Sequence, residues 1–283
     1  MALGSVRSCG VTTLALGLAA TWPSDRRVML VEADPAGGTV AASARWAPEP
    51  GLVSLAAAAR RGGDPTMVLD HCQHLPGGAA VLAGPALADQ AQSALGMLRP
   101  ILARLGELDA DVLLDCGRLD SVGLVTWQQA GRRVLVGRPR LPDLQALATW
   151  LDAQASDPGH VGLVMVGDGP YPDGEIAQTL GSEVLARVPW DPRAADALVT
   201  VPASARELRL APFVRAARTL ADRFAENDSR GTSYLAVDAE VDKHEAAAGA
   251  SGTVSVRSRV WRGRRPTGPS PSYNGSKPEE VAR

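Results

Sequence analysis

The 283-residue sequence contains few cysteines, and their placement excludes two common kinds of site. Cys9, Cys72 and Cys116 are too few and too irregularly spaced for a disulfide framework or a zinc site. They indicate a reducing compartment, so we expect a cytoplasmic protein. Aromatic residues are also scarce, with two Phe and three Tyr among abundant Ala, Arg, Gly and Pro. This bias is typical of a GC-rich genome and carries no functional information.

The sequence also lacks a strong net charge and a long apolar run. Its formal charge is -2 and its pI is near 6.1, which gives no global signal for nucleic acid or an anionic membrane. No stretch reaches the roughly 20 apolar residues of a membrane span. Arg7 and the following VTTLALGLAA imitate a signal peptide. We favour a buried helix, because residues 28–34 complete a strand–loop–helix–strand unit that cleavage would destroy.

Apolar strands alternate with helical patterns, which predicts a doubly wound α/β fold with a mostly parallel sheet and helices on both faces. The expected strands are residues 2–6, 28–32, 79–83, 111–114, 133–136, 161–166 and 184–188. The expected helices are residues 11–20, 39–44, 51–60, 86–105, 141–153, 174–180, 194–199 and 204–224. Pro100 is expected to interrupt the fourth of these helices and Pro212 to kink or split the last, which Ser204 would cap.

The composition divides the chain near residue 225. Residues 1–225 are apolar enough for one folded domain, whereas residues 226–283 are rich in Ser, Gly, Pro and charge, as in a disordered tail. Within the tail, arginines surround Trp261 in the segment Arg257–Arg265. A solvated tail is the ordinary interpretation. The alternative is a weak contact with nucleic acid or a membrane surface through this segment.

The first loop, in GSVRSCGVTT, is built like a phosphate-binding device. Small residues lead into a helix whose backbone N–H groups and dipole favour an anion. Gly10 precedes two threonines, and either hydroxyl could hold a Mg²⁺ that bridges phosphates. The regular pattern GxxxxGK[ST] is not matched, because Ser5 stands at its first glycine and Val11 at its lysine.

Aspartates follow three expected strands, where ligands of doubly wound sheets bind. Asp115 ends an apolar run and could anchor Mg²⁺ through water, as a Walker B aspartate does. Asp34 follows its strand two residues after Glu32 and could orient a water for attack on a terminal phosphate. Each acid alone could equally form a turn or cap a helix. Together with the loop they favour a nucleotide site.

The segments GSVRSCGVTT, VMLVEADPAGG and VLLDCGRL resemble, in order and spacing, the ParA/MinD superfamily of deviant-Walker P-loop ATPases. The later VGLVMVGDGP and VLARVPWDPRAADAL resemble that family's adenine-side strand and proline loop. The likeness covers about residues 2–225 and is nearest to an actinobacterial MinD-like group whose loop ends in GVTT. It implies ATP and Mg²⁺ as ligands, and a Mg²⁺-dependent ATPase if the chain is active.

The resemblance assigns roles to individual residues. It implies Mg²⁺ contacts for Thr12, Asp34 and Asp115, and places Asp34 at the attacking water. It implies nucleotide contacts for a set of loop and adenine-side residues, which are Ser8, Cys9, Gly10, Val11, Thr12, Thr13, Asp168, Pro189 and Asp191. The family's signature lysine falls at Val6, or at Arg7 if the loop is one residue shorter. Arg7 would then act catalytically across a homodimer, since guanidinium suits phosphate.

Val11 is the departure that matters most, because the family's loop lysine bridges the β- and γ-phosphates. Its absence removes a charge-assisted contact worth about 1.5–3 kcal/mol, so we expect weak or absent hydrolysis. One interpretation is an ATP-dependent positioning switch with a partner protein, cytoplasmic or peripheral at the inner face of the plasma membrane. Others are a pseudo-ATPase scaffold for pilus or secretion assembly, or a small-molecule transferase. Cys9 and Cys116 are either a redox pair or, as we favour, small packing residues.

The tail hypothesis makes a direct prediction. Deleting residues 226–283 should leave a cooperative thermal melt, because the tail lacks the apolar residues that build a core. Circular dichroism of the truncated and full-length chains measures this. A truncated chain without a cooperative transition would refute the predicted domain boundary.

Overall fold

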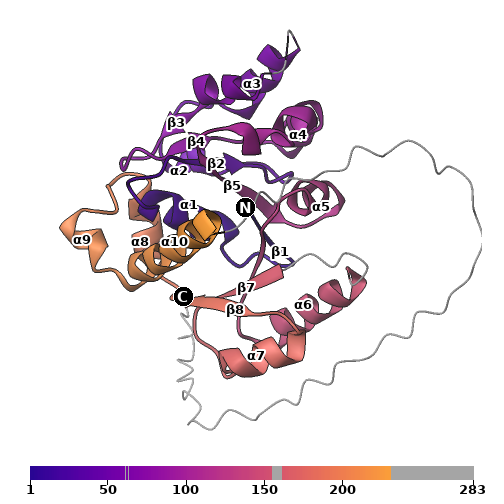
Figure 1. The fold of residues 1–283 in the computed structure, drawn as a ribbon, viewed down its shortest axis with the longest axis vertical. Helices are drawn as coiled ribbons and strands as arrows, with labels where there is room; N and C mark the ends of the chain where they lie inside the picture. Colours follow the sequence, from indigo (N-terminus) through magenta and orange to yellow (C-terminus); the bar gives the residue numbers. More distant parts are fainter. Residues whose placement is uncertain (61, 63, 155–160, 231–283) are drawn as a thin grey trace, which may run out of the picture.

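The computed structural model describes residues 1–60, 62, 64–154 and 161–230. Within these ranges the strands form one eight-stranded sheet in the order β3-β4-β2-β5-β1-β6-β7-β8 (Figure 1). All neighbouring strands are parallel except β3, which runs antiparallel to β4. The strands are β1 Ala2–Ser5, β2 Val28–Glu32, β3 Gln73–His74, β4 Ala80–Leu82, β5 Asp111–Arg118, β6 Arg133–Gly137, β7 Val161–Val166 and β8 Val184–Val188. The predicted doubly wound, mostly parallel sheet is confirmed.

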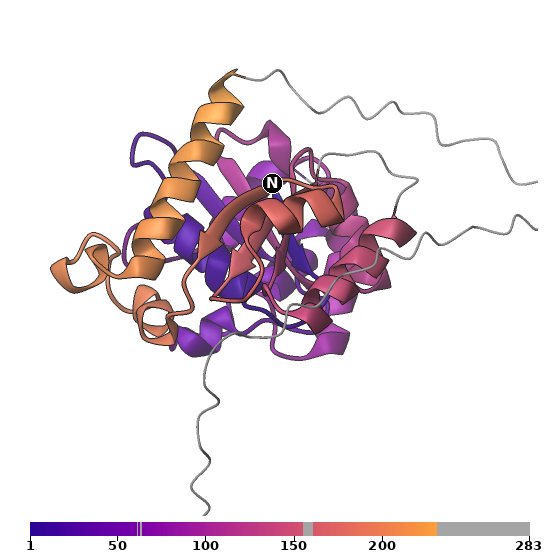
Figure 2. The same ribbon diagram turned by 90° about the horizontal axis from the view of Figure 1, so that it is seen from below.

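Helices cover both faces of the sheet (Figures 1 and 2). Along β2 the side chains alternate, since Leu30 joins one apolar core while Met29 and Val31 join the other. The first core contains α1 Val11–Thr21, α2 Val40–Ser43, α8 Pro192–Leu198, α9 Arg206–Arg209 and α10 Pro212–Arg230. The second contains α3 Leu52–Ala59, η1 Pro65–His71, α4 Ala88–Leu102, η2 Leu105–Glu107, α5 Ser121–Gln128, α6 Leu141–Ala153 and α7 Asp173–Leu180.

Several predicted boundaries were wrong. Strand β5 continues to Arg118, so Asp115 lies inside the strand rather than at its end. Helix α4 continues through Pro100 and ends at Leu102. Ala205, not Ser204, occupies the N-cap position of α9 and makes no side-chain capping bond, and Pro212 begins α10 at the position where proline is tolerated. Helix α5, η1 and β3 were not predicted.

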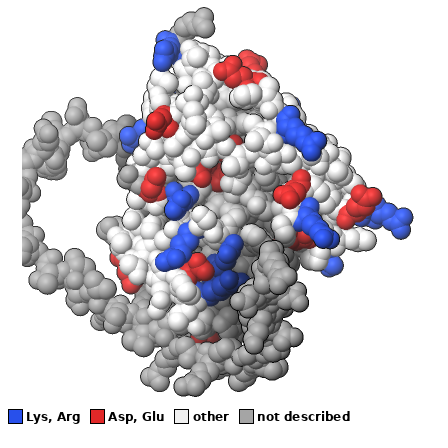
Figure 3. Space-filling view, turned by 180° about the vertical axis from the view of Figure 1, so that it is seen from behind, with Lys and Arg blue, Asp and Glu red and all other residues white. Residues whose placement is uncertain are grey.

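The last helix passes the predicted domain boundary. Helix α10 ends at Arg230, and the Arg257–Arg265 segment lies outside the described residues. None of the described helices has the length and apolar character of a membrane span. On the face shown in Figure 3, basic and acidic side chains are interspersed, in keeping with the small net charge.

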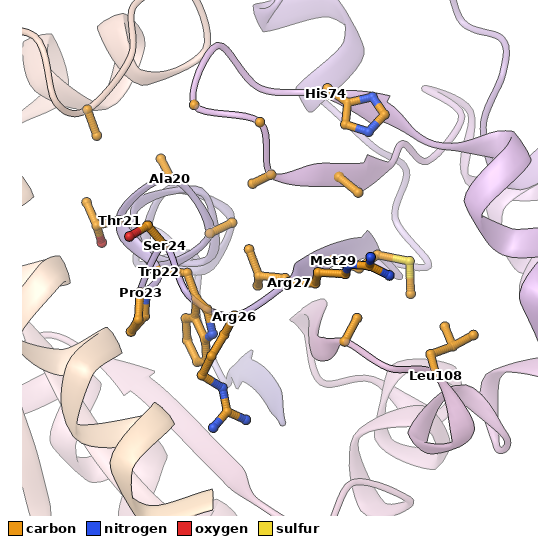
Figure 4. Close-up of a pocket in the computed structure, with 18 of the residues that line it drawn as sticks. Ala20, Thr21, Trp22, Pro23, Ser24, Arg26, Arg27, Met29, His74 and Leu108 are labelled. Atoms are coloured by element: carbon orange, nitrogen blue, oxygen red, sulfur yellow. The ribbon is translucent and has the colours of Figure 1, made fainter. Parts of the chain in front are cut away.

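The strand order reverses direction at β1. From β1 the chain first builds β2 and β4 on one side and later β6, β7 and β8 on the other. Ligands of such sheets bind at this reversal, beyond the carboxyl ends of the strands. A hollow of about 910 Å³ lies at the other end of the strands, near the amino ends of β2 and β4 (Figure 4). Its Arg26 is already held by both carboxylate oxygens of Asp111, each at 2.6 Å.

Candidate functional site

The loop between β1 and α1 presents a run of free backbone N–H groups at the reversal point. Gly10 adopts φ 96° and ψ 37°, a left-handed conformation that favours glycine. Its carbonyl accepts the first helical hydrogen bond, from Leu14 N–H at 3.0 Å. Within the described ranges, the N–H groups from Arg7 to Thr13 make no hydrogen bond. Consecutive free N–H groups at a helix start form an anion-binding cradle.

Asp115 is the carboxylate at the centre of this site. It is fully buried, and its Oδ1 accepts from Gly117 N–H at 3.0 Å. Its Oδ2 has no hydrogen-bond partner among the described residues. Burial raises the pKa of Asp115 to about 7, opposed by the Thr12 hydroxyl and supported by the charges of Glu32 and Asp34. The structure therefore brings Thr12 and Asp34 to Asp115, as the sequence predicts.

Asp34 lies directly over the backbone of Gly117. Its Oδ1 accepts from Ala36 N–H at 2.8 Å, in the turn after β2. A side chain at Gly117 is excluded, because its Cβ would stand 1.8 Å from Asp34 Oδ2. Burial raises the pKa of Asp34, and the charge of Arg118 opposes this. Asp34 and Asp115 thus come from neighbouring strands and flank one point.

Glu32 has a different, structural role. It is buried, and its carboxylate accepts from Thr39 N–H at 2.6 Å, Val40 N–H at 3.0 Å and Gly84 N–H at 2.9 Å. These bonds fix the turns after β2 and β4, and burial raises the pKa of Glu32. Its oxygens are therefore engaged, which leaves Asp34 as the acid able to act on a water.

The residues fit a Mg²⁺ ion that is completed by phosphates. In the described ranges, no three His, Cys, Asp or Glu side chains form a ready metal cluster. Mg²⁺ usually keeps waters and takes one or two carboxylates plus substrate phosphates. The unpartnered Oδ2 of Asp115 and the Thr12 hydroxyl supply such a partial ligand set.

The three residues predicted on the adenine side do not line one cavity together. Pro189 and Asp191 line a cavity of about 90 Å³ together with Gly10 and Thr13. The Asp191 side chain caps α8 by accepting from Ala194 N–H at 3.0 Å. Asp168 is exposed after β7 and is not among the residues that line this cavity.

Three other loop side chains, those of Arg7, Cys9 and Val11, have contacts outside the cradle, and Ser8 is exposed. Val11 is only 5% exposed and packs in the first core. Arg7 is exposed and lines a separate open hollow with residues of α6. Cys9 donates from Sγ to the carbonyl of Val136 at 2.9 Å, and burial raises its pKa to about 11. Cys9 and Cys116 are both buried free thiols with raised pKa values, which makes them poor redox groups.

Sequence reasoning missed two residues beside the loop, Arg138 and Trp190. Arg138 follows β6, and its guanidinium carbon lies 4.8 Å from the Trp190 ring centroid. Trp190 Cζ3 lies 3.8 Å from where a Cβ on Gly10 would stand. The available signals were an arginine directly after a buried strand and a tryptophan in the proline loop.

Solved structures of ParA/MinD ATPases share this fold. The septum site-determining protein MinD of Pyrococcus horikoshii, complexed with Mg-ADP, matches with TM-score 0.64 and 15% identity over 81% of this chain and 97% of that chain. The ParA family ATPase of Chlorobium tepidum matches with TM-score 0.60 and 14% identity over 78% of this chain and 96% of that chain. The MinC:MinD complex of Aquifex aeolicus matches with TM-score 0.57 and 13% identity over 80% of this chain and 94% of that chain. No family model and no curated protein matches the sequence. The predicted ParA/MinD-type fold is confirmed, and the actinobacterial subgroup stays a prediction.

The raised pKa of Asp115 predicts how stability changes with pH. Between the ordinary aspartate value of about 3.9 and about 7, the folded chain keeps a proton that the unfolded chain has released. This stabilisation is complete below about pH 4 and is lost as pH rises to about 7. Asp115→Asn removes the ionisable group. In urea unfolding with EDTA, the free energy of unfolding should therefore fall more steeply with rising pH in the wild type than in Asp115→Asn. The two slopes should differ by at most about 1.4 kcal/mol per pH unit. Equal slopes would contradict the buried, unpartnered carboxyl.

Proposed function

We propose that this chain, which has the ParA/MinD-type fold, binds ATP with Mg²⁺ and acts as a nucleotide-dependent switch in intracellular positioning. The observation that carries the proposal is the unpartnered, buried Oδ2 of Asp115 beside the free N–H groups of the first loop. An orphaned buried carboxylate is costly unless a cation completes it. A Mg²⁺–polyphosphate satisfies both the carboxylate and the amides.

The same residues suggest how the site would work. The amides from Arg7 to Thr13 would hold phosphate oxygens, and Thr12 and Asp115 would hold Mg²⁺, which neutralises phosphate charge when bound. Asp34 would orient a water near the terminal phosphate, because its position over Gly117 fixes its carboxylate. Val11 supplies no cation, and phosphoryl transfer depends mainly on positioning and electrostatics. We therefore propose weak or absent hydrolysis.

The biological setting is proposed from the fold neighbours. The Aquifex aeolicus structure is a MinC:MinD cell division complex, which supports a partner protein for this chain as well. A homodimer, with Arg7 reaching the neighbouring copy, is compatible with the exposure of Arg7. Chromosome partitioning, division-site placement or pilus and secretion assembly are the processes proposed, in the cytoplasm or peripherally at the inner face of the plasma membrane.

A nucleotide-independent scaffold is the second candidate. The buried side chain of Val11 favours it, because the loop position that would carry a lysine is part of the apolar core. The retained Asp115 and Thr12 favour the switch, since a scaffold has no need of a Mg²⁺ site.

A melting experiment separates these two functions. Ligand at a hundred times its Kd stabilises a protein by about 2.7 kcal/mol, so millimolar ATP with Mg²⁺ should raise the wild-type Tm. Thr12→Val keeps the side-chain volume but removes the hydroxyl, and should lose the part of the shift that depends on Mg²⁺. EDTA provides the reference. No wild-type shift at millimolar ATP would support the scaffold instead.

Restoring the loop lysine tests how the phosphates are held. Val11→Lys should tighten ATP binding about tenfold, because it adds a charge-assisted contact. It should also lower the Tm without ligand, because a buried valine leaves the core. Calorimetry measures Kd, with Val11→Met as an uncharged control of similar length. Unchanged affinity in Val11→Lys would show that the phosphates do not reach this position.

A further inference from the structure

The described part of the chain contains no lysine that could bind a phosphate. The chain's lysines, Lys243 and Lys277, both lie outside the described residues. Any cation that the described residues offer to a phosphate must therefore be an arginine or a histidine. With Asp34 and Asp115 already on one side, a bound polyphosphate requires a cation to limit repulsion.

Three arginines lie near the first loop, and their surroundings differ. Arg7 is exposed over the hollow along α6. Arg118 is exposed, and its charge acts on Asp34, so it serves the acidic side of the site. Arg138 is half-buried, and its charge acts on Cys9 in the loop itself. Arg138 is thus the cation on the side opposite the acids.

The guanidinium of Arg138 is held without using its donors. It stacks on Trp190 with 4.8 Å between its central carbon and the ring centroid. Among the described residues it makes no ion pair or hydrogen bond. Stacking on an aromatic face positions a guanidinium while its in-plane N–H groups stay free for a phosphate.

Trp190 is itself fixed at the mouth of the loop. Its Cβ lies 3.6 Å from the Cβ position of Gly167, and its ring edge reaches toward Gly10. Pro139, next to Arg138, packs closely against Gly169, where a Cβ would stand 2.0 Å from the Pro139 carbonyl oxygen. The ring is 57% exposed although it is large and apolar.

We propose that Arg138, positioned by Trp190, is the phosphate-binding cation of this site and replaces the lysine that Val11 omits. The inference rests on the proposed function and specifies its ligand as a nucleotide that carries at least two phosphates. The bound nucleotide would be clamped between Arg138 on one side and a Mg²⁺ held by Asp115 on the other.

Calorimetry with ATP and Mg²⁺ on the full-length chain tests this. Arg138→Met keeps a similar side-chain length and an apolar contact with the ring but removes the charge, and should weaken ATP binding about tenfold or more. It should also make the affinity less sensitive to NaCl, because a charge contact is lost. Arg138→Lys should lose less affinity than Arg138→Met, because it keeps the charge but not the stacked, planar guanidinium. Arg140→Met, an exposed arginine in the same turn, should match the wild type. Unchanged melts without ligand establish that each variant is folded.

Several results would overturn the inference. The first is an ATP affinity in Arg138→Met equal to that of the wild type. The second is an equal loss of affinity in Arg138→Met and Arg138→Lys with unchanged salt dependence, which would show that Arg138 shapes the site without binding phosphate through its charge. A loss in Arg118→Met without one in Arg138→Met would assign the cation to the other side. If the wild type binds no ATP at all, the proposed function fails and the inference fails with it.

Discussion

The buried carboxylate of Asp115 is the constraint on which the site depends. Its Oδ1 accepts from Gly117 N–H, whereas its Oδ2 has no hydrogen-bond partner among the described residues, and the side chain is fully buried. An ionised carboxylate in this position lowers the stability of the chain unless a partner completes it. Under the proposed function, an anion at the amides of the neighbouring loop and a divalent cation between it and Asp115 would provide that partner.

Charge around this point is divided between two sides. Asp34 and Asp115 stand where β2 and β5 lie side by side, and Glu32 braces the turns behind them. Across the loop, the stacked pair of Arg138 and Trp190 supplies the opposite sign. Val11 belongs to the core and not to this arrangement. In the proposed arrangement, the first loop binds phosphate through its backbone, and Arg138, after β6, supplies the cation.

The sequence predicts most of the fold because periodic apolar patterns report directly on buried strands and helices. It also predicts the grouping of Thr12, Asp34 and Asp115, because parallel strands bring their carboxyl ends to one edge. It could not predict that Arg138 lies on Trp190, since that contact joins residues far apart in the chain. Nor could the amino-acid sequence alone show that the Asp191 side chain caps α8 or that Arg7 lies beside α6. These depend on side-chain packing.

The most direct test of the central claim is binding of Mn²⁺, used in place of Mg²⁺ and followed by electron paramagnetic resonance. A partial ligand set made of one hydroxyl and one carboxylate holds such an ion poorly until phosphates complete it. The account predicts that wild-type protein binds Mn²⁺ tightly only when ATP is present, and that Asp115→Asn loses this coupling. Equal Mn²⁺ binding with and without ATP, or undiminished coupling in Asp115→Asn, would contradict it.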